Sequence, residues 1–421
     1  RLYCVSCNII KRKKSKYTEN INKTGGNLKT MKIVIAVDSF KGSLSSIEAE
    51  RAVEEGIKAA MPGAKTVRMP LADGGEGTVE AFVLGAGAKE IRLTVTGPLG
   101  KPVACTYGIL KEEKTAIIEV AAAAGLTLTP EKERNPLNTT SYGVGEIIRD
   151  AIEKGCRRFI VGMGGSATND GGLGMLNALG FHFENIHGES AGIYGRDLAS
   201  VEQVNTSQAA PELSQCEFIV ACDVNNPLCG ANGASMVFGP QKGAGKEMAE
   251  QLDQSLRHFS EITRKALQKD MAQMPGAGAA GGLGYGFMTY LNGKMENGID
   301  LVLKAVQMET ELSDADIVVT GEGRMDFQTA MGKAPVGVAR LAKKYGCMVL
   351  AFTGAAAPEA GTCNGKGIDA YFPIVRGPIG LREAMETETA YANLRDAAKQ
   401  VFSLVAKLQA ARASLLNSSI K

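Results

Sequence analysis

A run of β-branched residues near the start of the chain predicts a buried parallel strand. Residues 32–37 carry no charge after the first position, which is typical of a strand covered on both faces. After a loop, apolar residues recur at helical spacing over residues 49–61, and Ser45 with Glu48 forms a capping-box pattern ahead of them. Residues 66–71 favour a second strand. The pattern indicates a strand–helix–strand unit whose first strand ends in a functional-looking loop.

The same alternation of strands and helices returns near the C-terminus. Apolar runs predict strands at residues 317–320, 349–353 and 370–375. Helical spacing covers residues 335–345 and 389–411. Both ends of the chain therefore favour one parallel sheet.

The middle of the chain has a different pattern. Short strands joined by turns are predicted at residues 91–95, 104–110 and 115–120, which favours antiparallel or mixed pairing. Two further buried strands are predicted at residues 159–163 and 218–222. This part of the chain therefore favours a second, separate sheet.

These elements predict an α/β protein of two lobes. The chain has 421 residues, more than a single hydrophobic core usually supports. We expect a flavodoxin- or Rossmann-like parallel-sheet domain from residues 31–90 and 295–411, and an inserted α/β domain with a mixed sheet from residues 91–294. A C-terminal tail is expected over residues 412–421.

The first 30 residues differ from the rest in composition. They hold eight Lys or Arg and one Glu, so the remainder of the chain carries a net charge of −5 although the whole carries +2. We expect residues 1–30 to be a disordered, non-native or upstream extension, with Met31 as the initiator and a transit peptide as the alternative. The acidic body, without Trp and only 5% aromatic, argues against nucleic-acid binding.

Two further compositional features narrow the function. No apolar run approaches the roughly 20 residues that span a bilayer, so no membrane partner is expected. Nine cysteines, an odd number scattered through apolar segments, favour reduced thiols and a cytoplasmic location. Only three His are present and none lies beside a motif, which argues against His-dependent hydrolysis or a zinc site.

A glycine-rich segment at residues 162–174 follows a predicted strand and precedes a predicted helix. This order aims backbone N–H groups and a helix N-terminus at a phosphate. Tight turns that need positive φ are the alternative, but the number of glycines and polar residues favours ligand binding. The candidate residues are Gly164, Gly165, Ser166, Thr168, Asn169 and Asp170.

Three charged loops follow strands of the predicted parallel sheet. Because the carboxyl ends of parallel strands share one sheet edge, we expect these loops to converge on a ligand. The loop at residues 38–43 holds Ser39 and Lys41. The other loops, at residues 71–78 and 320–326, contribute Asp73, Glu76, Glu322, Arg324 and Asp326.

Asp223 directly follows a predicted strand of the second sheet. A carboxylate in this position can bind Mg²⁺ or accept a proton, because magnesium needs only one or two carboxylates besides phosphate oxygens and waters. An Asx-turn is the alternative, since Asn225, Asn226 and Pro227 follow.

A second glycine cluster, at residues 275–287, contains no charged residue. Its Gly278, Gly281 and Gly282 are candidates for nucleotide binding, and a hinge between the lobes is the alternative. A P-loop is absent, because the nearest match, residues 239–247, has Glu247 where Ser or Thr is required. No dinucleotide fingerprint follows residues 32–37.

Taken together, these segments resemble the type II glycerate kinase family of bacteria. The resemblance covers about residues 31–411. It includes two unusual sequence motifs, PLADGGEGT at residues 70–78 and GMGGSATNDGGLG at residues 162–174. It implies ATP-dependent phosphorylation of D-glycerate with Mg²⁺, with 2-phosphoglycerate as the favoured product and the active site between two lobes. Whether the protein forms a homodimer is left open.

For this activity we predict three catalytic residues, Lys41, Asp170 and Asp223. Lys41 or Arg324 would hold phosphates or the glycerate carboxylate, and Asp223 with Asp170 as its partner would bind Mg²⁺ or orient the attacking hydroxyl. Which acid is the base and which the metal ligand stays open. The alternatives are a kinase for another small hydroxy acid and a non-catalytic two-lobed binding protein.

Overall fold

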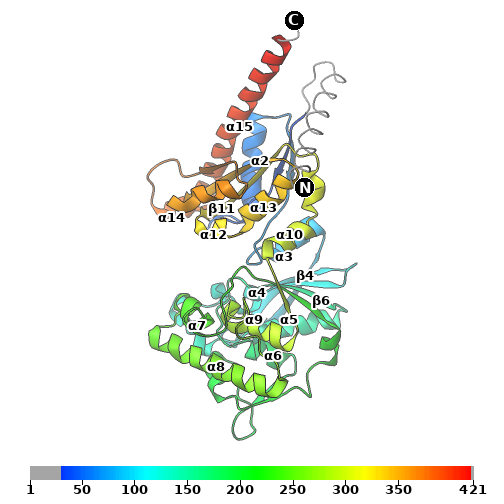
Figure 1. Ribbon diagram of the computed structural model, residues 1–421, viewed down its shortest axis with the longest axis vertical. Helices are drawn as coiled ribbons and strands as arrows, with labels where there is room; N and C mark the ends of the chain where they lie inside the picture. The colour runs from blue at the N-terminus through cyan, green and yellow to red at the C-terminus, as the bar shows by residue number, and fades with distance from the viewer. Residues whose placement is uncertain (1–29, 419–421) are drawn as a thin grey trace, which may run out of the picture.

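The computed structural model describes residues 30–418, whose strands form two main sheets in two stacked lobes (Figure 1). The expected disordered extension lies outside the described residues, apart from Thr30. No helix within residues 30–418 is both long and apolar enough to cross a membrane.

The first lobe contains a five-stranded parallel sheet with the order β13-β12-β11-β1-β2. Numbered along the chain within this sheet, the order is 2-1-3-4-5, as in flavodoxin-like folds. The predicted strands are therefore confirmed, with somewhat different ends. They are β1 (Lys32–Ile35), β2 (Lys65–Arg68), β11 (Ile317–Met325), β12 (Met348–Ala356) and β13 (Ala370–Pro373).

The second lobe contains a six-stranded sheet with the order β10-β9-β6-β5-β4-β3. Pairing is antiparallel among β3, β4 and β5 and parallel in the rest, so the predicted mixed sheet is confirmed. Its strands are β3 (Lys89–Thr96), β4 (Pro102–Leu110), β5 (Thr115–Glu119), β6 (Arg158–Gly162), β9 (Glu217–Ala221) and β10 (Lys294–Glu296). They begin two residues before and end two residues after the expected 91–294. A separate hairpin pairs β7 (His182–Glu184) with β8 (Gln203–Asn205).

The helices follow from the sequence pattern at several places. Ser45 caps the first one and its capping box with Glu48 is present. The helices are α2 (Ser46–Ala60), α3 (Thr78–Ala86), α4 (Val120–Ala124), α5 (Tyr142–Glu153), α6 (Leu173–Ala178), α7 (Ala234–Phe238), α8 (Lys246–Leu267), α9 (Ala279–Tyr290), α10 (Gly298–Ala305), α11 (Met308–Leu312), α12 (Phe327–Ala330), α13 (Ala334–Lys344), α14 (Leu381–Met385) and α15 (Thr387–Ser418). The tail expected over residues 412–421 is wrong up to Ser418, because α15 continues through it and projects from the lobe in Figure 1.

Three hydrophobic clusters hold these layers together. One lies between the parallel sheet and the pair α2 and α15, where Gly56 lets the two helices approach closely because a Cβ would lie 2.3 Å from the Arg395 carbonyl oxygen. Another fills the far face of the mixed sheet beneath α5, α6 and α9. The third contains residues from both sheets, including Val34, Ile117 and Ile160, with α3 and α10 between them (Figure 1). The two lobes therefore share a core.

Glu119 at the end of β5 ties α3 to the mixed sheet. Its Oε1 accepts a 2.7 Å hydrogen bond from the backbone N–H of Val79 in the first turn of α3, where a carboxylate also meets the positive end of the helix dipole. Burial nevertheless raises the pKa of Glu119 to about 7, because removal from water penalises the charged form more than the backbone donors favour it.

This raised pKa predicts how stability depends on pH. A carboxyl whose folded pKa lies above its unfolded value contributes stability that is present below about pH 4.5 and lost as pH rises through 7. We therefore expect Glu119→Gln to gain roughly 1–3 kcal/mol in unfolding free energy relative to wild type between pH 5 and pH 8. Urea unfolding at several pH values measures it, with the exposed Glu112→Gln as control. Parallel pH curves for wild type and Glu119→Gln would contradict the assignment.

Candidate active site

The carboxyl ends of both sheets meet around the loop that follows β2. In that loop the Gly74 carbonyl accepts a 3.4 Å hydrogen bond from the backbone N–H of Gly164, which belongs to the glycine-rich segment after β6. Gly298 at the start of α10 lies against the Asp73 carbonyl, where a Cβ would come within 2.1 Å. Residues 71–78 therefore join the two lobes at the edge where ligands bind in open α/β sheets.

Lys41 and Asp73 form the first part of the site. Lys41 Nζ lies 3.3 Å from Asp73 Oδ2, and the Lys41 side chain is largely exposed whereas that of Asp73 is mostly enclosed. The neighbouring Asp38 is buried, and burial together with the Asp73 charge raises its pKa to about 8. Asp38 is therefore mainly protonated at pH 7, and its Oδ1 accepts from the Ser39 backbone N–H at 2.7 Å.

Asp223 approaches this pair from the mixed sheet. Its Oδ1 accepts hydrogen bonds from Asn297 Nδ2 at 3.1 Å and from the Gly298 N–H at 3.2 Å, both at the start of α10. No described residue donates to Oδ2. The side chain is exposed, yet partial desolvation and the nearby Asp73 charge raise its pKa to about 6. One oxygen is thus held by the protein while the other stays available to a ligand.

The loop after β11 adds a third acidic group. Glu322 is buried and accepts a hydrogen bond from the Thr329 hydroxyl. Burial raises its pKa to about 7, against the opposing effect of the Lys333 cation. Asp326 instead caps α12 through the Gln328 N–H at 2.9 Å. The predicted residues of this loop therefore divide, with Glu322 facing the charged cluster and Asp326 serving the local fold.

Two predicted residues have weaker ties to the cluster. Arg324 is exposed, with its Nε 3.8 Å from Asp326 Oδ2. Glu76 is also exposed, and its negative charge helps to raise the pKa of Glu119. The structure brings together Lys41, Asp73 and Asp223 and leaves these two free to reach a ligand from the rim.

Asp170 is enclosed by its own loop. Its side chain is fully buried, and Oδ2 accepts from the Ser141 N–H and hydroxyl, both at 2.7 Å, and from the Gly174 N–H at 3.3 Å. Oδ1 accepts from the Gly172 N–H at 3.2 Å. These neighbours differ from those of Asp223, so the geometry gives Asp170 a loop-organising role and does not bring it to Asp223 as a metal-binding partner.

The other polar residues of the glycine-rich segment are also buried. Asn169 Nδ2 donates to Ser235 Oγ at 3.0 Å, and Ser166 Oγ accepts from Lys242 Nζ at 3.0 Å. The Thr168 hydroxyl is buried without a hydrogen-bond partner among the described residues. Gly165 is exposed and Gly164 partly so, with φ +73° at Gly165. The backbone at Gly164 and Gly165 is therefore the part of the segment that a ligand can reach.

The second glycine cluster packs against the first. A Cβ on Gly281 would lie 1.9 Å from the Thr168 carbonyl oxygen, and φ is +68° there. A Cβ on Gly278 would lie 2.4 Å from the Pro227 carbonyl oxygen, and one on Gly282 would lie 2.9 Å from Gly171 Cα. These three glycines allow close backbone packing within the second lobe, and both nucleotide binding and a hinge between the lobes stay predictions.

Three contributors to the site escaped the sequence analysis. Asn297 and Lys333 were not singled out, although Asn297 caps α10 and the Lys333 charge lowers the pKa of both Asp223 and Glu322. Lys242 was noted only as part of a failed P-loop. Their roles depend on contacts across large sequence separations, which no local pattern reveals.

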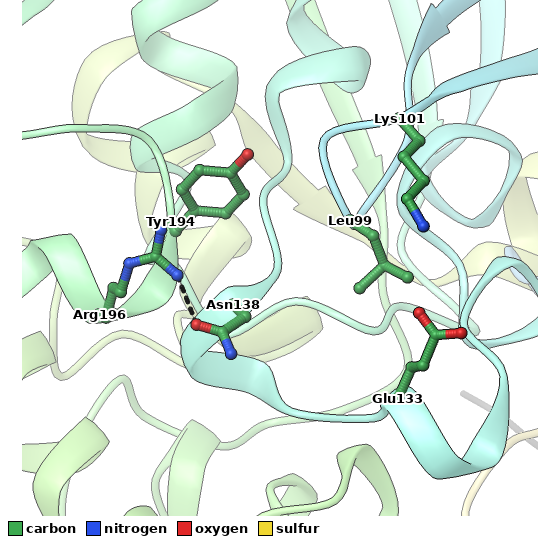
Figure 2. A pocket seen from close by; sticks show the side chains of 6 residues that line it. All are labelled: Leu99, Lys101, Glu133, Asn138, Tyr194 and Arg196. Atoms are coloured by element: carbon green, nitrogen blue, oxygen red, sulfur yellow. Dashed lines mark hydrogen bonds between the residues drawn. The ribbon is translucent and has the colours of Figure 1, made fainter.

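No ready-made metal cage marks the site within the part of the chain that the structure describes. Among residues 30–418 no group of three or more His, Cys, Asp or Glu is arranged to hold a metal ion. A shallow hollow of about 420 Å³ lies elsewhere on the second lobe, where Arg196 stacks over the Tyr194 ring and bonds to Asn138 (Figure 2). It is lined by Leu99, Lys101, Glu133, Asn138, Tyr194 and Arg196. The site instead consists of loops that meet at an open edge.

Comparison with known proteins gives a consistent result. A family model described as the glycerate kinase family matches residues 33–406. The chain is 47% identical to glycerate kinase of Bacillus subtilis (strain 168) over 361 residues, 86% of this chain and 94% of the relative. It is 45% identical to glycerate 2-kinase of Escherichia coli (strain K12) over 376 residues, 89% and 98% of the two chains. A crystal structure described as glycerate kinase 2 from Salmonella typhimurium LT2 has a TM-score of 0.79 and 42% identity, and covers 90% of this chain and 99% of that chain.

Proposed function

The chain belongs to the glycerate kinase family, and on this premise we propose that it transfers the γ-phosphoryl group of ATP to D-glycerate with 2-phosphoglycerate as product. The proposed site is the region where the loops after β1, β2, β9 and β11 face the glycine-rich segment after β6. The name of the Escherichia coli relative, a glycerate 2-kinase, supports the 2-phospho product. A cytoplasmic location stays a prediction, and whether the protein forms a homodimer stays open.

One observation carries the proposal most directly. Lys41, Asp73 and Asp223 come from three loops of the two lobes, yet they lie close enough that Asp73 raises and Lys41 lowers the pKa of Asp223. Phosphoryl transfer depends on positioning and charge neutralisation more than on covalent chemistry, and a cluster of one exposed cation with available carboxylates meets both needs.

The residues present fit a magnesium ion held by a single carboxylate. Asp223 offers Oδ2 while Asn297 and Gly298 fix Oδ1, and magnesium in kinases needs few protein ligands because phosphate oxygens and waters supply the rest. When bound, the ion would neutralise charge on the phosphates. The backbone N–H of the exposed Gly165, which donates to no described residue, would bind a phosphate oxygen, and Lys41 would bind a phosphate or the glycerate carboxylate.

The acceptor hydroxyl must lose a proton as it attacks phosphorus. The hydroxyl oxygen forms the new P–O bond, ADP leaves with the electrons of the broken bond, and the proton passes to a nearby carboxylate. Asp73 and Asp223 are the carboxylates that could take this proton, whereas Asp38 is mainly protonated at pH 7 and cannot serve as the base. We propose that Asp38 keeps the Lys41 loop in place through its bond to Ser39.

An assay of purified protein with ATP and D-glycerate, with and without Mg²⁺, tests the function. We expect magnesium-dependent turnover, and phosphorus-31 NMR of the product showing phosphate on the 2-hydroxyl. A 3-phospho product would overturn the regiochemistry alone. Turnover only with another small hydroxy acid would discard glycerate, and absence of nucleotide turnover with every acid by the folded protein would favour a binding protein.

A further inference from the structure

Lys242 is a buried cation that the proposed reaction does not yet use. It ends a 3₁₀ helix, Pro240–Lys242, in the segment that fails as a P-loop, and it is 2% exposed. Its Nζ donates to Ser166 Oγ at 3.0 Å and to the Thr168 carbonyl at 2.7 Å. No carboxylate of the described residues lies within the 4.0 Å of an ion pair with it, so its charge lacks a contacting counter-ion.

An unpaired buried ammonium is unfavourable, and the surroundings show it. Burial lowers the pKa of Lys242 to about 7, and only the more distant Asp170 carboxylate opposes the shift. A site that holds a buried cation with only one distant carboxylate is prepared for an additional negative charge.

The contacts of Lys242 lead to the face of the glycine-rich segment that is open to solvent. Since Ser166 Oγ accepts from Lys242, the Ser166 hydroxyl proton is left to donate elsewhere, and no described residue accepts it. The Thr168 hydroxyl nearby is also buried without a partner. The exposed Gly165 directly precedes Ser166. An anion at Gly165 would therefore meet backbone N–H groups, a polarised hydroxyl and, behind it, a cation.

We propose that Lys242 is a positioning residue for an anion site at Gly164–Ser166, acting through Ser166 and gaining its counter-charge from the bound anion. The proposal rests on the proposed function for the nature of the ligand, which is a group with anionic oxygens. Two sources offer that chemistry, a nucleotide phosphate and the carboxylate of the hydroxy acid. Binding of either to the neutral-lysine form restores the proton, so binding above pH 7 takes up a proton at Lys242.

Calorimetric titration of the whole protein with ADP and, separately, with D-glycerate tests this coupling. Measurements at pH 8 in Tris and in HEPES, which differ in ionisation enthalpy, give the number of protons taken up. We expect wild type to take up more protons than Lys242→Met, by up to about one, for the ligand that occupies the site. The affinity of wild type for that ligand should fall as pH rises from 7 to 9, and Lys242→Met should bind about tenfold or more weakly at pH 7 with a flatter profile. The variant Lys246→Met, whose side chain is 84% exposed, is the matched control.

The variants also separate a positioning role from a merely structural one. Ser166→Ala keeps the lysine but removes the hydroxyl, so we expect weaker binding with the cooperative thermal transition retained. If Lys242→Met fails to fold, the proton uptake of wild type and its loss in Ser166→Ala decide the matter. Unchanged affinity and proton uptake in the variants for both ligands would overturn the proposal. Proton uptake that depends on Lys242 on ADP binding, in a protein that does not turn over D-glycerate, would support this anion site and overturn the proposed function. Turnover of D-glycerate without proton uptake that depends on Lys242 would support the proposed function and overturn this anion site.

Discussion

Asp223→Asn is expected to lower kcat for D-glycerate phosphorylation by at least about a hundredfold, as loss of a positioned acid or metal ligand should. Asparagine can keep the bonds from Asn297 and Gly298 through its carbonyl oxygen, so the local fold is preserved. What is lost is the charge on the second oxygen. Steady-state kinetics over a range of Mg²⁺ concentrations measures the effect, and partial recovery at high Mg²⁺ would identify the metal role.

The control for this variant lies on the neighbouring helix. Asp300 on α10 is 53% exposed and pairs with Arg340, away from the charged cluster. Asp300→Asn is expected to stay within about twofold of wild type, because exposed ion pairs contribute little. A wild-type rate for Asp223→Asn with an unchanged melting temperature would remove Asp223 from the active site.

Asp170→Asn is expected to act mainly on stability, lowering the unfolding free energy by about 3 kcal/mol or more. Three donors, the N–H and hydroxyl of Ser141 and the N–H of Gly174, point at Oδ2. An amide in this pocket would place its NH₂ group against donors or leave Gly172 unpaired. Chemical denaturation measures the loss, and turnover per folded molecule should also fall because the glycine-rich segment shifts.

A double-mutant cycle with Ser141 separates this role from catalysis. Ser141→Ala removes one donor, so the two substitutions should be non-additive, with a coupling of about 1 kcal/mol or more. Asp223→Asn, by contrast, should keep the stability of wild type. An Asp170→Asn protein of wild-type stability that lost its dependence on Mg²⁺ would restore the catalytic role predicted from the sequence.

The local patterns were sufficient for the elements and for the fold class. Residues 32–37 read as a doubly buried strand and Ser45 with Glu48 as a helix cap because periodicity and capping depend on neighbours in sequence. The mixed pairing was likewise readable from short strands joined by turns. The end of α15 was missed, since helical continuation to Ser418 carries no local stop signal that the pattern could use.

The sequence identified only some of the residues that form the candidate active site. The carboxyl ends of parallel strands must lie at one edge, so Lys41, Asp73 and Glu322 could be grouped from the sequence. The sequence did not distinguish Asp223, with one oxygen available, from Asp170, whose oxygens are both engaged by Ser141 and the loop glycines. Both are acids that follow or lie near buried strands, and only the count of donors around each one separates their roles.

The sequence by itself therefore determined the two-lobed α/β class, the family resemblance and the loops that carry the chemistry. The tertiary structure decided which side chains in those loops face one another, and it revealed Lys242 behind Ser166 and Glu119 beneath α3. The physical reason is the range of the interactions. Periodicity, caps and turns act over a few residues, whereas burial, donor count and the charge of a neighbour depend on segments that the fold alone brings together.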